Sequence, residues 1–138
     1  MKKPLVFAFL FSLPHFVHAL PATGLVCSSY DGDFKLEAVI NHYTGDLYAN
    51  TLKIYEKGTQ RVPEVKQYRN YSDDIFIIAS LGREGTSDDV GYVISLERAY
   101  RDPTEASGNA EKYTTTMTGD RETDSNTYMS VDCKIGTP

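Results

Sequence analysis

Hydrophobic and polar residues alternate along most of this chain, and the alternation has a period of two. The clearest example is the segment 34–41, in which Phe34, Leu36, Ala38 and Ile40 are separated by Lys35, Glu37 and other residues. This period is typical of a β-strand with one face on a core and one face in water. No helical repeat extends over more than about two turns. The pattern therefore predicts a chain made of strands and turns.

Turn residues divide the pattern into strands. Asp31-Gly32, Thr44-Gly45-Asp46 and Lys57-Gly58 each interrupt the alternation with residues that favour tight turns. The fourth predicted strand contains Pro63, which favours a bulge or a sheet edge because proline has no backbone N–H. The pattern predicts eight strands, at residues 25–30, 34–41, 47–56, 60–71, 75–81, 90–99, 112–118 and 127–135.

Short strands at regular spacing are typical of up-and-down barrels and sandwiches. We therefore predict an all-β domain, an eight-stranded antiparallel meander that forms a closed or nearly closed barrel. The alternative is a β-sandwich whose terminal strands pair or whose two sheets are linked by a disulfide.

The only two cysteines, Cys27 and Cys133, lie in the first and the last predicted strand. In a meander of eight strands they fall at the same end of the sheet. Each also shares a strand face with hydrophobic residues, Leu25 in one strand and Val131 in the other. We expect one disulfide that joins the first and last strands and faces the interior; two free thiols are the alternative.

The first residues have the layout of a secretory signal peptide. Two lysines precede an apolar run at residues 5–13, and Val17-His18-Ala19 has the spacing of small residues at a cleavage site. The run is too short to span a bilayer, and Val26 stands before Cys27 where a lipoprotein signal requires a small residue. We predict a signal peptide at residues 1–19 and a single domain at residues 20–138, periplasmic or extracellular and without a membrane anchor. A retained anchor is the alternative.

The charge of the chain argues against some partners. The sequence has 14 Lys and Arg against 19 Asp and Glu, a formal charge of −5. Loss of Lys2 and Lys3 with the signal peptide leaves 12 against 19, a charge of −7. No basic cluster offsets phosphate repulsion, so we expect no binding to nucleic acid. The partner is expected to be a protein, possibly a basic one, or a small ligand.

Charged residues gather in the turns and loops that fall at one end of the predicted meander. Loops on a rigid scaffold commonly carry binding residues, although loops are also charged because they contact water. The candidate partner-binding residues are Asp31, Asp33, Arg83, Glu84, Asp88, Asp89, Asp120, Arg121, Glu122 and Asp124. A second candidate surface is an apolar patch of Phe76, Ile78 and Val93, which the alternation places outside the core on adjacent strands.

Catalytic and metal-binding residues in a recognisable pattern are lacking. After removal of the signal peptide His42 is the only histidine, and no motif marks a nucleophilic serine. The segment from Asp120 has oxygen ligands at alternate positions, but Ser125 stands where a calcium loop has glycine and Val131 where it has glutamate. We expect no metal, no cofactor and no enzymatic activity.

The expected architecture is similar to that of the periplasmic inhibitors of chicken-type lysozyme, which are small exported barrels with a disulfide. Their inhibitory loops carry a Ser-Gly-x-x-Tyr motif and a later Lys-Gly motif preceded by tyrosine. Here Ser107-Gly108 is followed by Tyr113, two residues too far along, and Lys57-Gly58 comes earlier in the chain. The resemblance covers the architecture alone, and architecture does not determine function.

Three functions follow as hypotheses. The first is a non-enzymatic binding or inhibitory module of the cell envelope that contacts a protein through the acidic loops. The second is a lipocalin-like carrier of a small apolar ligand. The third, which the sequence favours least, is a hydrolase that uses loop carboxylates.

Overall fold

The computed structural model describes residues 22–48, 50–82 and 88–136, with only the backbone described at Asp88. These residues form one antiparallel sheet of nine strands. The predicted signal peptide at residues 1–19 lies outside the described residues. The strands are β1 (Ala22–Ser29), β2 (Phe34–Asn41), β3 (Lys53–Glu56), β4 (Thr59–Arg61), β5 (Glu64–Asn70), β6 (Asp74–Gly82), β7 (Asp88–Arg98), β8 (Glu105–Thr118) and β9 (Arg121–Gly136).

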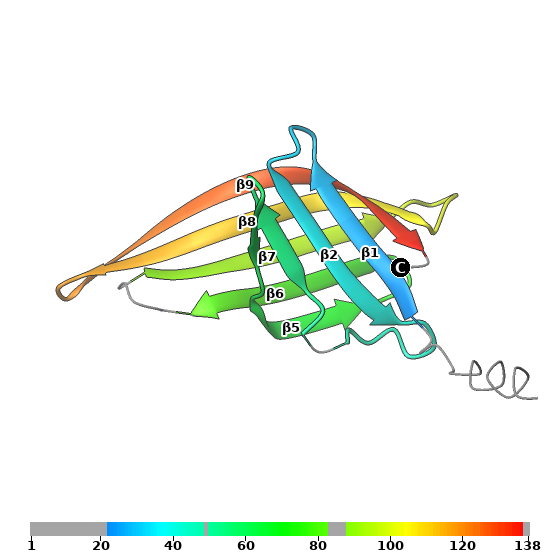
Figure 1. The fold of residues 1–138 in the computed structure, drawn as a ribbon, viewed down its shortest axis with the longest axis horizontal. Helices are drawn as coiled ribbons and strands as arrows, with labels where there is room; N and C mark the ends of the chain where they lie inside the picture. The colour runs from blue at the N-terminus through cyan, green and yellow to red at the C-terminus, as the bar shows by residue number, and fades with distance from the viewer. Residues whose placement is uncertain (1–21, 49, 83–87, 137–138) are drawn as a thin grey trace, which may run out of the picture.

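The sheet curls into a half-barrel, and its first and last strands are neighbours in the middle of it (Figure 1). The strand order is β4-β3-β2-β1-β9-β8-β7-β6-β5, so β4 and β5 form the two edges. The all-β, barrel-like antiparallel fold predicted from the alternation is confirmed. The pairing of β1 with β9 is also confirmed, over six residue pairs from Gly24 opposite Gly136 to Ser29 opposite Val131.

The number of strands is nine and not eight, because the fourth predicted strand is divided. β4 pairs with β3, whereas β5 pairs with β6, and Val62 and Pro63 lie between them. Pro63 has no N–H to give to a ladder, which is consistent with a break at this point. The sheet is therefore interrupted between two strands that are consecutive in the chain.

The disulfide between Cys27 and Cys133 is present as predicted. The two residues lie directly opposite each other in the pairing of β1 with β9, and their Cα atoms are 4.0 Å apart. Such a short separation is typical of an antiparallel pair that does not exchange backbone hydrogen bonds. Both cysteines are buried. Disulfides persist in oxidising compartments, so this bond is compatible with one.

The core lies on the concave face of the half-barrel and contains buried residues from β1, β2, β3, β6, β7, β8 and β9. Along β2 the buried residues are Phe34, Leu36, Ala38 and Ile40, in the alternation read from the sequence. Tyr92, Ile94 and Leu96 of β7 are buried in the same way. Within the described residues, no helix is long and apolar enough to cross a membrane.

Candidate functional site

The predicted partner-binding residues occupy separate parts of the sheet. Asp31 and Asp33 lie in the turn between β1 and β2, while Asp88 and Asp89 begin β7. Asp120, Arg121, Glu122 and Asp124 lie at and beside the tip of the β8–β9 hairpin. Figure 1 shows that this tip projects well away from the β1–β2 turn. Arg83 and Glu84 lie outside the described residues, as does the side chain of Asp88.

Asp31 shapes the turn in which it lies. Its Oδ1 atom accepts hydrogen bonds from the Ser29 hydroxyl at 2.6 Å and from the backbone N–H of Asp33 at 3.0 Å. The Ser29 bond, followed by the Asp33 bond, holds the pKa of the Asp31 carboxyl below its usual value. Gly32 has a φ of 78°, which a residue with a side chain rarely adopts. Asp31 therefore has a local structural role in this turn.

The β8–β9 hairpin is more regular than its sequence suggests. The predicted loop at residues 119–125 is a two-residue turn at Gly119 and Asp120, followed at once by β9. Gly119 supplies the positive φ, 64°, that such a turn requires. The two strands then stay in register from Thr118 opposite Arg121 to Glu105 opposite Lys134. Arg121, Glu122 and Asp124 therefore lie on a strand and not in a loop.

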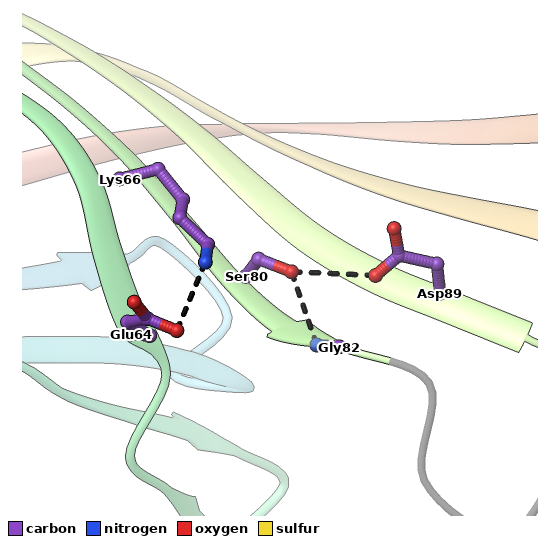
Figure 2. A network of polar contacts seen from close by, with 5 residues as sticks. All are labelled: Glu64, Lys66, Ser80, Gly82 and Asp89. Carbon is purple, nitrogen blue, oxygen red and sulfur yellow. Dashed lines mark hydrogen bonds and ion pairs between the residues drawn. The ribbon is translucent and has the colours of Figure 1, made fainter.

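Asp89 and Asp124 are brought into one row across three strands. Thr115 of β8 lies opposite Asp89 of β7 on one side and opposite Asp124 of β9 on the other. Its hydroxyl donates to Asp124 Oδ1 at 2.9 Å. The Ser80 hydroxyl of β6 donates to Asp89 Oδ1 at 3.3 Å and accepts from the N–H of Gly82 at 3.0 Å (Figure 2). Both carboxylates are thereby positioned on the convex face.

Lys66, on the same side of the molecule, is engaged by an acid of its own strand. Its Nζ lies 2.9 Å from the Glu64 carboxylate, and the two lie beside Ser80 in Figure 2. β5 is bulged between Val65 and Gln67, which places Lys66 at the irregular position of the strand. Lys66 therefore forms its ion pair with Glu64 and not with Asp89.

The convex face of β7, β8 and β9 is strongly acidic. Residues that alternate with the buried core positions of these strands point to this face. Lys134 is the only lysine or arginine that the described part of this face carries, and it pairs with Glu105. We call this surface the acidic face; its carboxylates are Asp89, Glu97, Glu105, Glu111, Glu122, Asp124 and Asp132.

The N-terminal part of β9 has a strand on one side only. β1 pairs with β9 no further than Val131, whereas β8 pairs with it as far as Arg121. Along residues 121–130, the side of β9 that faces away from β8 has no strand beside it among the described residues. We call this segment the free edge. Residues 121–128 are all exposed, and Tyr128 exposes 68% of its surface.

Sequence reasoning did not find the free edge because it ended one strand at 118 and began the next at 127. Residues 119–126 contain no hydrophobic residue, so no alternation marks them as a strand. The signal that could have found it is the enrichment of β-branched threonine on both sides of Gly119, at Thr114, Thr116 and Thr123.

The predicted apolar patch lies on the convex face of β6 and β7. Phe76, Ile78 and Val93 are each half-buried, and Ile78 lies opposite Val93 in the sheet. The guanidinium of Arg69 lies 4.7 Å from the centre of the Phe76 ring. This cation–π contact covers part of the patch with a charged group.

A group of charges on the concave side ties β3 to β8 across the open side of the half-barrel. The Glu56 carboxylate lies 3.0 Å from Lys112 Nζ and 3.6 Å from Arg61 Nε. Tyr92 lies on the same face of the sheet. Burial, and after it the charge of Glu56, raises the pKa of the Tyr92 hydroxyl. Because both cations of the group face Glu56, its carboxylate is a structural link.

The single histidine of the described residues, His42, lies just beyond the end of β2 and is exposed. Its Nδ1 is 3.3 Å from the Thr23 hydroxyl. Over the described ranges, no three histidine, cysteine or acidic side chains come together in a way that could hold a metal ion.

Comparison of the chain with protein-family models, with curated proteins and with solved structures finds no match. The functional proposal therefore rests on the acidic face and the free edge.

Proposed function

We propose that this protein is a non-enzymatic, exported binding module of the cell envelope that contacts a protein partner through the free edge and the acidic face. The observation that carries the proposal is that residues 121–130 of β9 pair on one side only. The partner contributes an extended segment that contains lysine or arginine. The segment adds to the sheet beside β9 as a further strand.

The free edge has the backbone groups that strand addition uses. An unpaired edge presents a row of N–H and C=O groups, and main-chain hydrogen bonds supply the affinity in such complexes. Alternate residues of an antiparallel strand direct these groups to opposite sides. Arg121, which flanks the two-residue turn, directs its groups toward β8, so the even-numbered residues from Glu122 to Ser130 direct theirs to the free edge.

The free edge carries charged side chains but lacks several other features that usually prevent strand addition. Proteins commonly protect edges with lysine, proline or a bulge. Residues 121–130 contain no lysine and no proline, and their pairing with β8 is without a register shift. This supports a role in binding.

The side chains beside the free edge indicate the chemistry of the partner. Glu122 and Asp124 lie on the free edge itself, Glu111 lies opposite Tyr128, and Asp132 lies just beyond. A basic segment complements these charges, which speeds encounter and sets specificity. Tyr128 is a large exposed aromatic in the middle of these acids, and tyrosine is enriched among residues that anchor interfaces.

The other hypotheses have less support. Leu36, Ile54 and Ile94 have no exposed surface and fill the centre of the concave face, so a carrier of an apolar ligand has no supporting observation there. The carboxylates that the sequence offers to a hydrolase are spread over a convex surface. Active sites are usually concave.

A labelled peptide that alternates lysine with threonine tests the proposal, with fluorescence anisotropy as the readout. We expect binding that weakens as salt is raised, because exposed charges are screened. A peptide of the same length that alternates glutamate with threonine should not bind. Equal affinity for the two peptides would contradict the proposed charge complementarity.

Two variants separate the edge from the charges. Asn126→Pro removes a backbone N–H that faces the free edge, and Asn126→Ala is its matched control, because both lose the hydrogen bond from Asn126 to Glu111. We expect the proline variant to lose peptide binding and the alanine variant to keep it. Reversal of Glu111, Glu122 and Asp124 to lysine should weaken binding by about tenfold or more, equivalent to about 1.4 kcal/mol. Full binding by Asn126→Pro would remove strand addition from the proposal.

Export is tested by the mass of the protein recovered from outside the cytoplasm. Cleavage after Ala19 yields a chain that begins at Leu20 and has one disulfide. Recovery of the full-length chain in the cytoplasm would contradict the localisation.

A further inference from the structure

A pocket of about 460 Å³ lies at the end of the sheet opposite the β8–β9 tip. Its walls come from the beginning of β1, the ends of β2, β5, β7 and β9, and the loop before β8. The polar side chains that matter here are Thr23, His42, Asn70 and Arg98, and Ile40 and Ile135 supply apolar surface. None of them belongs to the acidic face or the free edge.

Arg98 is the only lysine or arginine that lines this pocket. Its Nη2 donates to Asn70 Oδ1 at 2.6 Å, while its Nε is buried and has no hydrogen-bond partner among the described residues. None of the ion pairs that the described part of the chain forms includes Arg98. A half-buried guanidinium without a carboxylate is unusual in an acidic protein, because burial of a charge is costly unless it is paired.

The guanidinium is held in place by a fixed set of hydrogen bonds. Asn70 Nδ2 donates to the carbonyl oxygen of Gly45 at 3.1 Å, so the amide directs its oxygen to Arg98. The same carbonyl accepts from the Tyr68 hydroxyl at 2.8 Å. Burial raises the pKa of Tyr68 to about 12, so this hydroxyl remains a donor at neutral pH. Arg98 is thereby oriented before any ligand arrives.

We propose that this pocket binds a small organic monoanion through its carboxylate, with Arg98 as the charge partner. The planar guanidinium matches the geometry of a carboxylate and can donate to it from more than one nitrogen. Ile40 and Ile135 provide a surface for a short aliphatic chain. The pocket volume is at the lower end of the range for small-molecule sites.

The surrounding charges favour a carboxylate over phosphate. Asp102 accepts two hydrogen bonds from Thr104, which lines the pocket, and Asp46 lies close enough to Tyr68 to raise its pKa. Arg98 is the single cation of the pocket, so it compensates one negative charge, and the two nearby aspartates repel a dianion more strongly than a monoanion. Nucleotides and phosphate esters are therefore poor candidates.

The experiment is a titration of the ¹⁵N-labelled mature protein with butyrate, followed by amide chemical shifts. Butanol serves as the neutral probe, and inorganic phosphate at about pH 8, where it is mostly the dianion, serves as the doubly charged probe at matched ionic strength. We expect saturable shifts confined to residues around the pocket with butyrate, and much weaker ones with the other two. Absence of saturation at about 10 mM butyrate, or binding of butanol or phosphate as tight as that of butyrate, would overturn the proposal.

Variants locate the site. Arg98→Met should weaken butyrate binding by about tenfold or more, while Arg98→Lys should keep part of it. Arg101→Met is the matched control, because Arg101 is exposed and does not line the pocket, and it should bind as the wild type does. If Arg98→Met fails to fold, Thr23→Leu replaces it. That change fills the pocket from β1 without altering Arg98 and should also abolish binding. Unchanged binding in the folded variant would overturn the assignment.

The result of the butyrate titration does not depend on whether the proposed peptide binding at the free edge is correct. The pocket and the free edge share no residue, so the alternating lysine–threonine peptide should bind to Arg98→Met as it does to the wild type.

Discussion

The two halves of the β8–β9 hairpin are built from the same two strands but have different surroundings. In the half near the chain terminus, Ala106, Ala110, Val131, Cys133 and Ile135 are buried in the core. In the half beyond Glu111, no described side chain of either strand is buried, although every residue remains paired. The comparison shows that the ladder continues past the point where the core ends.

The two halves of the hairpin therefore contribute differently to the stability of the domain and to the binding of a partner. Burial of one large hydrophobic side chain contributes about 1.5–3 kcal/mol, whereas one cross-strand pair on an exposed sheet contributes about 0.2–1 kcal/mol. The core half therefore determines whether the domain folds. The outer half contributes less to stability, so its side chains are free to contact a partner.

The largest effect is expected from the disulfide, which anchors the core half. Replacement of Cys27 and Cys133 by alanine removes a link between residues 106 positions apart. On the chain-entropy model this costs about 4–5 kcal/mol of the free energy of unfolding. Urea unfolding of the double variant against the oxidised wild type measures the loss. A change of less than about 1 kcal/mol would contradict the view that the bond stabilises the domain chiefly by constraining the unfolded chain.

A pair of alanine substitutions compares the core with the outer half of the β8–β9 hairpin. Ile94→Ala, which removes a side chain with no exposed surface, should cost about 2–5 kcal/mol. Thr127→Ala, at an exposed position of the outer half, should change the free energy of unfolding by no more than about 0.5 kcal/mol. Both are measured by urea unfolding. Similar losses at the two sites would mean that the outer half is as important for folding as the core.

Alanine substitutions at two glycines test how little space there is for a side chain between β7 and β8. A Cβ at Gly108 would lie 2.0 Å from the backbone oxygen of Ser95, so Gly108→Ala requires the backbone to move and should cost about 1–3 kcal/mol. At Gly91 the Cβ would meet the Tyr113 ring, a side chain that can rotate away. We expect Gly91→Ala to lower the melting temperature less than Gly108→Ala. The reverse order would contradict the close packing of β7 on β8.

The smallest effect on stability is expected from the charge of Asp31 in the β1–β2 turn, and it depends on pH. The pKa of Asp31 is lowered in the folded protein, so its charged form adds stability above the unfolded pKa of about 3.8. This contribution is lost as the pH falls through the lower folded pKa. The difference in melting temperature between the wild type and Asp31→Asn should therefore narrow below about pH 3.8. A constant difference from pH 7 to pH 3 would exclude a role for the charge.

Much of the fold could be predicted because the core leaves a period of two in the sequence. The alternation at 34–41 and 90–99 and the positions of the two cysteines sufficed for the strand faces, the disulfide and the neighbouring terminal strands. The same reasoning missed strands that lack a core below them. Residues 121–125 have no apolar repeat because both of their faces contact water, so the sequence predicts a loop there.

The candidate sites were harder to predict for a different reason. The acidic face collects residues from three strands, and only the register shows that Asp89 and Asp124 lie in one row. The pocket around Arg98 joins the ends of five strands. Nothing near Arg98 in the sequence indicates that it has no acidic partner among the residues that the structure describes. Such arrangements depend on contacts between distant parts of the chain.

The position of β9 at the centre of the sheet has a consequence for the order of synthesis. β9 is the last of the described strands to be synthesised, yet both β1 and β8 pair with it. The two wings of the sheet can therefore not join until β9 has been synthesised, and pairing between segments so far apart in sequence is slow. The two cysteines can therefore meet only late in folding, once β9 pairs with β1.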